Sequence, residues 1–128
     1  MTSPGPLVVD DGSFRSKVLA VLGDPEKVSI IGTITKTGKT SLAISSETRI
    51  PPSTAYRKLV ELRNLGLVVR ERVEVREGKR ISYYVAAFTE IRLKSADGHL
   101  RLEMVPSEAT VSRLWISLLW DSQPPEET

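Results

Sequence analysis

The chain has 128 residues, a size typical of a single folded domain. Its composition, 40% hydrophobic and 27% charged with 8 Gly and 8 Pro, excludes collagen-like, low-complexity and wholly disordered proteins. No stretch approaches the roughly 18 consecutive apolar residues of a membrane span, and residues 1–12 lack the basic and apolar regions of a secretory signal. We therefore expect a cytoplasmic protein with no membrane partner.

The supply of catalytic and metal-binding side chains is small. The chain has no Cys, which excludes disulfides, thiolate nucleophiles and Cys-based zinc sites. The single His, His99, follows an Asp-Gly turn in a strand pattern, far from any nucleophile motif, so a solvent-facing strand histidine is the simpler interpretation. Phosphate-binding glycine loops, dinucleotide fingerprints and HExxH are all missing from the sequence. We expect no enzyme, no cofactor and no metal site.

The charges are unevenly distributed along the chain. The segment from Arg49 to Arg80 contains nine basic and four acidic residues, a net charge of +5, whereas the rest of the chain carries about −3. Such a segment can bind a polyanion, although a solvated charged surface is the ordinary alternative.

Three helices are predicted before residue 50. Ser13 is a good N-cap for a first helix that ends at Leu22. Asp24 and Pro25 open a second helix that runs to about Lys36, although its β-branched residues would also suit a strand. A short extended stretch, Thr40-Ser41, then leads into a third helix over about 42–48.

The segment from Arg49 to Val68 is the most informative. Pro51-Pro52 ends one helix and can begin another, and Gly66 ends the new helix, predicted over about 52–65. Its apolar residues fall on one face: Ala55, Leu59, Leu62 and Leu65. The opposite face is polar and basic, with Tyr56 at the margin: Ser53, Thr54, Arg57, Lys58, Glu61 and Asn64.

Two hairpins follow this helix. In the first, over about 70–85, we expect three valines on one face of the leading strand, Val69, Val73 and Val75, and the charged residues on the other. The second hairpin turns at Asp97-Gly98. After Pro106, Ser107 caps a last helix from Glu108 to about Trp120.

This order of elements predicts an α+β fold, a winged helix-turn-helix with an additional β-hairpin and a C-terminal helix. In that layout the helix over 52–65 enters the major groove of double-stranded DNA, and the basic hairpin over 70–85, the wing, lies on the backbone. The candidate DNA-binding residues are Thr40, Ser41, Ser53, Thr54, Tyr56, Arg57, Lys58, Arg63, Arg76, Lys79 and Arg80.

These candidates have different expected roles. Arg57 is the best candidate for a bidentate guanine contact, whereas Lys58 and Arg63 are more suited to phosphate. Thr40 and Ser41 stand at a helix start that can hold another phosphate. Each has a plainer alternative: Ser53 and Thr54 as helix-start residues, Arg57 and Lys58 as a solvated face, the wing cations as protection of an edge strand.

Residues 14–88 resemble the winged-helix domain of ArsR-like and related archaeal and bacterial transcriptional regulators. The motifs that carry the resemblance are VLAVLGDPEKVSII, IPPSTAYRKLVELRNLGLV and GKRISYYV. The resemblance implies a DNA-binding transcriptional regulator. Metal-sensing members use Cys and His clusters, which this chain lacks, so metal sensing of that kind is not expected.

The last predicted helix presents a broad apolar surface: Val111, Leu114, Trp115, Leu118 and Leu119. This surface either docks on its own domain or meets a second copy, and the resemblance favours a homodimer. The expected organisation is a flexible leader (1–12), a DNA-binding domain (13–88), a hairpin with a dimerisation helix (89–120) and a flexible tail (121–128). The alternative function is a winged-helix protein-interaction module in a transcription or repair assembly.

Overall fold

The computed structural model describes residues 5–111 of the chain. Four complete helices lie within these residues, α1 (Gly12–Leu22), α2 (Pro25–Thr33), α3 (Ser41–Thr48) and α4 (Pro52–Leu65), and a further helix begins at Glu108. The strands are β1 (Leu7–Val8), β2 (Val68–Arg76), β3 (Lys79–Ala86), β4 (Phe88–Ala96) and β5 (His99–Pro106). The order helix, helix, helix, strand, strand over α2–β3 is the winged helix-turn-helix arrangement that the sequence predicts.

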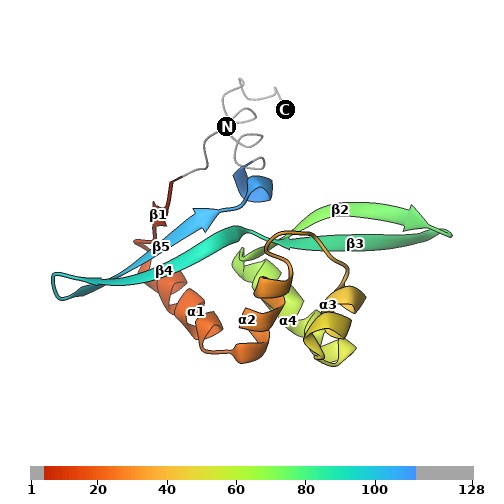
Figure 1. Ribbon diagram of the computed structural model, residues 1–128, viewed down its shortest axis with the longest axis horizontal. Helices are drawn as coiled ribbons and strands as arrows, with labels where there is room; N and C mark the ends of the chain where they lie inside the picture. The colour runs from red at the N-terminus through yellow and green to blue at the C-terminus, as the bar shows by residue number, and fades with distance from the viewer. Residues whose placement is uncertain (1–4, 112–128) are drawn as a thin grey trace, which may run out of the picture.

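The strands form two antiparallel sheets that point in opposite directions. One sheet has the order β1-β5-β4, and the other is the β2–β3 hairpin. Figure 1 shows the two hairpins extending to opposite sides of the molecule, with the four helices gathered on one side of the strands. The wing therefore projects well away from the additional hairpin.

Polar side chains define where the helices begin. Asp11 caps α1 by accepting from the backbone N–H of Ser13 and Phe14, so the expected cap at Ser13 is wrong. The carboxylate two residues earlier reaches the same free N–H groups. Asp24 caps α2 as expected, but α2 ends at Thr33 rather than near Lys36.

The hydrophobic core joins all four helices to the first sheet. Its fully buried side chains include Val18, Ile30, Ile34, Ile44, Leu59, Leu62, Leu67, Leu102 and Met104. Each helix thus contributes one apolar face, and β5 contributes Leu102 and Met104. The additional hairpin is therefore part of the same core as the helices, since its strand β5 fills the space above them.

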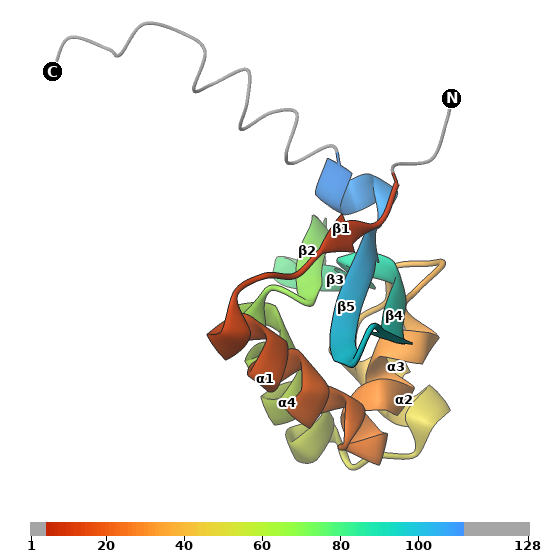
Figure 2. The ribbon, with the colours of Figure 1, turned by 90° about the vertical axis from the view of Figure 1, so that its left-hand side faces the viewer.

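The two ends of the described chain meet on the other side of the strands. Leu7 and Val8, which fall within the expected flexible leader, pair with Met104 and Glu103 of β5. A helix begins at Glu108, as predicted, and its first turn is held by Thr110, whose hydroxyl donates to the Ala87 carbonyl at 2.6 Å. Figures 1 and 2 place this turn across the strands from α1–α4.

Within residues 5–111, no helix combines the length and apolar character that crossing a membrane would require.

Candidate nucleic-acid interface

The turn between α3 and α4 is short and tightly held. Arg49, at the end of α3, adopts a left-handed conformation with φ of 62°, which reverses the chain before Pro51. The Ser45 hydroxyl donates to the Ile50 carbonyl at 2.5 Å, and Ile50 is buried. These contacts hold α4 against α3 and fix which face of α4 turns outward.

The outward face of α4 carries several of the predicted contact residues. Ala55, Leu59 and Leu62 are buried against the core. Ser53 is exposed, and Tyr56 is 53% exposed. Since each turn of an α-helix has 3.6 residues, Ser53, Tyr56 and Arg57 share one side of the first two turns. This side combines a hydroxyl, a phenol and a guanidinium.

Arg57 is the accessible cation of this face. Its side chain is 60% exposed, and its Nη1 donates to Glu61 Oε2 at 2.9 Å. Glu61 also pairs with Lys27 of α2 at 2.9 Å. Lys27 first, and Arg57 second, lower the pKa of Glu61. Because Lys27 remains as a partner of Glu61, Arg57 can turn toward a phosphate or a base without leaving an unpaired carboxylate.

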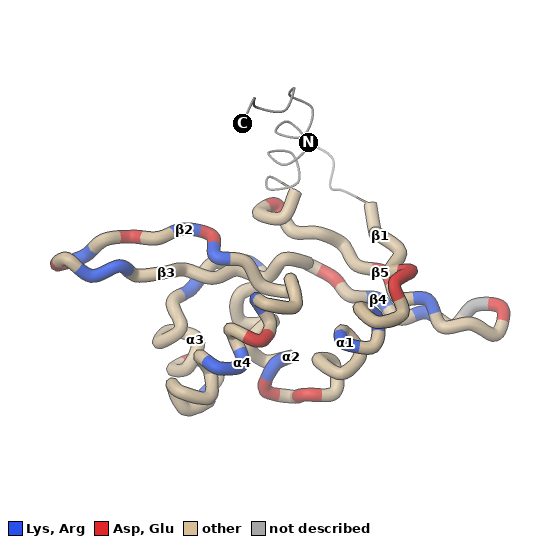
Figure 3. The backbone as a smooth tube through the Cα atoms, turned by 180° about the vertical axis from the view of Figure 1, so that it is seen from behind, with Lys and Arg blue, Asp and Glu red and all other residues tan. Residues whose placement is uncertain are grey.

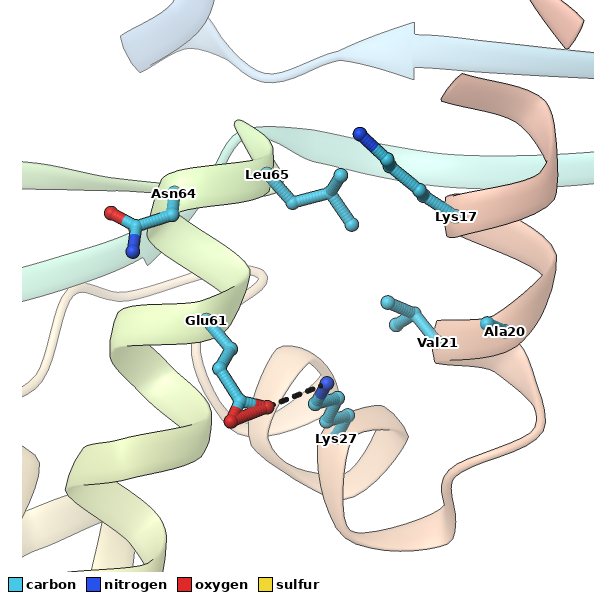
Figure 4. Close-up of a pocket in the computed structure, with 7 residues that line it drawn as sticks. All are labelled: Lys17, Ala20, Val21, Lys27, Glu61, Asn64 and Leu65. Carbon is cyan, nitrogen blue, oxygen red and sulfur yellow. Dashed lines mark ion pairs between the residues drawn. The ribbon is translucent and has the colours of Figure 1, made fainter. Parts of the chain in front are cut away.

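The Lys27–Glu61 pair lies at one end of a shallow hollow of about 460 Å³ between α1 and α4. Figure 4 shows Leu65 and Lys17 at the other end of the hollow, with Val21 between them and the pair. The hollow lies where α4 faces α1, and two of its lining residues, Glu61 and Asn64, continue the polar side of α4 on which Arg57 lies.

Lys58 does not lie where a phosphate contact requires it. Its Nζ is 2.8 Å from Asp24 Oδ2 and 2.9 Å from Glu26 Oε1, and its side chain is only 13% exposed. Hydrogen bonds to Asp24 and then Glu26 raise the pKa of Lys58, so the ammonium stays charged and paired. We therefore remove Lys58 from the candidate interface, because its charge is neutralised by the start of α2.

The remaining helical candidates lie at different distances from the Arg57 face. Thr40 caps α3, accepting from the Ala43 N–H at 3.1 Å, and Ser41 is its first residue. Lys39, next to this cap, exchanges two main-chain hydrogen bonds with Tyr84 of β3, so the start of α3 adjoins the wing. Thr54 is half-buried, and Arg63 is exposed in the last turn of α4, nearly three turns beyond Ser53.

The wing is attached to the core at its base and free at its tip. At the base Val68, Tyr84 and Ala86 are buried, and the Ala86 N–H donates to the Ile34 carbonyl of α2. At the tip Lys79 and Arg80 are exposed, and within the described part of the chain neither forms an ion pair. Figure 3 shows the Lys and Arg segments along the wing, with acidic segments between them.

A bulge in β2 changes the predicted faces of the wing. The register shifts between Arg70 and Arg72, so that Arg70 pairs with Tyr84 while Arg72 pairs with Tyr83. Directly opposed residues share a face of a sheet, so Val69 lies on the face of Arg72 and not on that of Val73. The expected alternation, with Val69, Val73 and Val75 together, is wrong at Val69 because Glu71 adds one residue to the strand.

Arg76, a predicted contact residue, lies in a cluster that the sequence analysis did not find. Glu74 accepts from Arg72, Arg76 and the Tyr83 hydroxyl at 2.8–3.1 Å. The guanidinium of Arg72 lies 3.9 Å from the centre of the Tyr83 ring. We call these four residues, Arg72, Glu74, Arg76 and Tyr83, the Glu74 cluster. The i, i+2 spacing of Arg72, Glu74 and Arg76 was a usable signal, but pairing with Tyr83 depends on the bulge.

The donors of the Glu74 cluster perturb its ionisation. The hydrogen bond from Arg72, then those from Tyr83 and Arg76, hold the pKa of Glu74 below its usual range. Glu74 in turn raises the pKa of Arg72. Glu74 and Arg72 are therefore both charged near neutral pH.

Of the predicted dimerisation residues, Val111 is half-buried at the end of the described chain, and Leu114, Trp115, Leu118 and Leu119 lie outside the described residues. In residues 5–111 no group of three His, Cys, Asp or Glu side chains is placed to hold a metal ion.

Comparisons with known proteins return solved structures only: no protein-family model and no curated protein sequence matches the chain. One similar structure is the homodimeric winged helix-turn-helix DNA-binding domain of a possible ArsR-family transcriptional regulator from Mycobacterium bovis, with 18% identity and a TM-score of 0.48 over 85% of this chain and 80% of that one. Another is NolR from Sinorhizobium fredii, with 12% identity and a TM-score of 0.42 over 86% of this chain and 85% of that one. Likenesses of this size transfer neither an activity nor a residue's role to this chain.

Proposed function

We propose that the protein is a sequence-specific double-stranded DNA-binding transcriptional regulator that acts as a homodimer. In this proposal α4 enters the major groove and the β2–β3 wing lies along the backbone. No residue has a catalytic role. The observation that carries the proposal is the outward face of α4, where Ser53, Tyr56 and Arg57 are presented together while Ala55 and Leu59 anchor the helix to the core.

The chemistry of this face suits base edges and phosphates. An α-helix fits the major groove, and a guanidinium can donate two parallel hydrogen bonds to guanine. Tyr56 and Ser53 can donate to phosphates on either side of such a contact. The start of α3 adjoins the base of the wing through Lys39. In the proposal, α4 supplies base-reading contacts and the wing supplies phosphate contacts.

The wing supplies positive charge that binds DNA phosphates whatever the base sequence. Lys79 and Arg80 are exposed at the tip of a hairpin that projects from the core, where they can each neutralise a phosphate. Their contribution to affinity comes from released counterions and so depends on salt.

The position of the last helix is compatible with a dimer that leaves α4 open. Its first turn is anchored at Ala87, across the strands from α1–α4 (Figure 2). A second copy that met the molecule at residues 108–111 would lie on the side away from α4. A two-fold dimer of this kind predicts a palindromic site with half-sites about one helical turn apart.

Selection of bound fragments from a random duplex pool, followed by fluorescence anisotropy on the selected site, tests the proposal. We expect an enriched palindrome, tight binding to it, and weak binding to scrambled duplex that declines steeply with salt. The double variant Y56A/R57A should lose preference for the selected site, and R101A on β5 serves as the loss of a comparably exposed cation, 57% against 60%, in the hairpin that extends away from the wing (Figure 1).

The protein-interaction alternative has one observation in its favour. Leu93 and Leu100, at the far end of the β4–β5 hairpin, are 50% and 59% exposed. A partner protein could cover them. No binding to any duplex at micromolar protein and low salt would favour this module over the DNA-binding function.

A further inference from the structure

Resting on the proposed DNA-binding function, we propose that Glu74 is an intramolecular competitor of DNA phosphate. It holds Arg72 and Arg76 on the wing, limits the affinity of the wing for the backbone, and yields these guanidinium groups only where a phosphate displaces it. Without such a role, the negative charge of Glu74 would only weaken the attraction of a basic wing for DNA.

The register of the wing places Glu74 in the middle of a cationic face. Arg72 pairs with Tyr83, Glu74 with Ile81, and Arg76 with Lys79. Directly opposed residues share a face, so three cations, Arg72, Arg76 and Lys79, surround the carboxylate on one side of the hairpin. Among the paired positions from Arg72 to the tip, Glu74 is the one acidic residue on this face.

Glu74 uses both carboxylate oxygens to hold its neighbours. Oε2 accepts from Arg72 Nε at 3.1 Å, and Oε1 accepts from Arg76 Nη2 at 2.8 Å and from the Tyr83 hydroxyl at 3.1 Å. Arg72 is further fixed by Glu71 at 2.9 Å and by the Tyr83 ring. Two of the cations on this face are therefore committed to a carboxylate within the hairpin.

A phosphate can replace that carboxylate because it offers the same recognition chemistry. Guanidinium groups bind carboxylate and phosphate through the same fork of N–H donors. The side chains of Arg72 and Arg76 are 47% and 63% exposed, so a backbone phosphate can reach them without unfolding the hairpin. In the free protein both guanidinium groups are already paired with a carboxylate. Binding a DNA phosphate breaks that ion pair as it forms a new one, so each such contact adds little to the free energy of DNA binding.

The tip of the wing provides the contrast. Lys79 and Arg80 form no ion pair within residues 5–111, so binding a phosphate there costs no internal partner. In this part of the chain, the wing thus has cations without an ion pair at its tip, Lys79 and Arg80, and cations paired with Glu74 in its middle, Arg72 and Arg76. Removal of its charge should open the middle and make the whole face available.

Measuring duplex affinity of Glu74→Gln across a salt series tests the inference. Glu74→Gln frees Arg76 of its carboxylate and leaves Arg72 paired with Glu71 alone, so one to two more phosphates can be neutralised and the slope of log K against log salt should become steeper by about 1 to 2 units. The corresponding loss of affinity between 50 and 200 mM salt should then be up to roughly tenfold larger than that of the wild type. The gain at low salt should be similar on specific and random duplexes, because phosphate contacts carry no sequence information.

Glu90→Gln is the matched control. Glu90 accepts from Arg92 through two hydrogen bonds of 3.1 Å in the same i, i+2 arrangement, but on β4, in the hairpin that points away from the wing. Both substitutions change the net charge by the same amount and remove the same kind of pair. Adding Arg76→Ala to Glu74→Gln should remove about half of the steeper slope, which identifies the released cations as the cause.

The outcomes separate this inference from the proposed function. A steeper slope and tighter binding for Glu74→Gln than for Glu90→Gln, with an unchanged circular dichroism spectrum, support it. If the wild type binds duplex DNA and the two variants behave alike, Glu74 does not compete with phosphate, and the proposed function stands without this inference. If the wild type binds no duplex at all, both fail.

Discussion

Asp24 and Lys58 connect the start of α2 to the middle of α4. Asp24 Oδ2 lies 2.8 Å from Lys58 Nζ, while Oδ1 of the same carboxylate accepts from the N–H groups of Glu26 and Lys27 at 3.0 and 3.2 Å. One carboxylate therefore caps one helix and positions another. This relationship explains why a lysine from the polar side of α4 is withdrawn from solvent, and it leads to the first prediction.

Asp24→Ala should destabilise the fold more than Asp11→Ala. Both residues cap a helix through two backbone N–H groups, and loss of a cap costs about 1 kcal/mol. Asp24→Ala also removes a partner from Lys58, which is mostly buried, whereas Asp11 has only its cap to lose. Free energies of unfolding from urea titrations measure the difference, and equal losses would show that the Asp24–Lys58 pair adds nothing to stability.

Stability should fall as the solution is made acidic. Lys58 lowers the pKa of Asp24, Lys27 and Arg57 lower that of Glu61, and Arg72 leads the groups that lower that of Glu74. These carboxyls release protons more readily in the folded chain than in the unfolded one. Their contribution to the free energy of unfolding is fully present above the pKa of about 4 that they have in the unfolded chain. It is lost as the pH falls through their lower pKa values in the folded protein.

The urea midpoint should therefore decline from about pH 5 downward, within the window that these lowered pKa values set. The change is modest because the groups are solvent-accessible. Lys58→Met should make the decline shallower by removing the chief donor to Asp24. A midpoint that stays constant down to pH 3 would contradict the assignment of these ion pairs.

Two leucines of the helix-turn-helix should respond very differently to truncation. Leu62 of α4 is fully buried, so Leu62→Ala should cost about 2–5 kcal/mol through lost burial and a cavity. Leu42 of α3 is 70% exposed, and Leu42→Ala should change stability by less than about 0.5 kcal/mol. Chemical unfolding at neutral pH tests both. A large loss for Leu42→Ala would mean that a partner or a second copy covers α3.

Base reading and phosphate binding should separate between α4 and the wing. Arg57→Ala should cost about 1–3 kcal/mol on the selected site and relax base preference, because a bidentate contact to guanine is lost. Lys79→Ala should weaken all sequences alike and reduce the salt slope by about one unit. Anisotropy on matched specific and scrambled duplexes separates the two effects. An equal loss on both duplexes for Arg57→Ala would show that it does not read bases.

Local chemistry made several elements predictable. Pro52 can start a helix, and Gly66, at φ of 89°, can end one, so the limits of α4 follow from residues at its own ends. Both hairpin turns place two consecutive residues at positive φ, and Asp97-Gly98 is a sequence that favours this geometry. Such features need no information from distant parts of the chain.

Competing local signals were harder to interpret. Asp11 and Ser13 are both good N-cap residues, and only the geometry of the first turn shows that Asp11 accepts the free N–H groups. The β-branched residues of α2 left its helical state open, and it is helical because Ile30 and Ile34 pack in the core.

The amino-acid sequence by itself determined the order of helices and hairpins, the apolar face of α4 and the cationic segment from Arg49 to Arg80. The tertiary structure alone decided which of those cations remain available. Lys58 is paired with Asp24 and Glu26 at the start of α2, Arg76 with Glu74, and Arg72 with Glu71 and Glu74. The physical reason is that the periodicity of apolar residues in the sequence shows on which side of a helix or strand a charged side chain lies. Its ion-pair partner depends on which elements pack against that side and, in the wing, on the bulge in β2 that shifts the register.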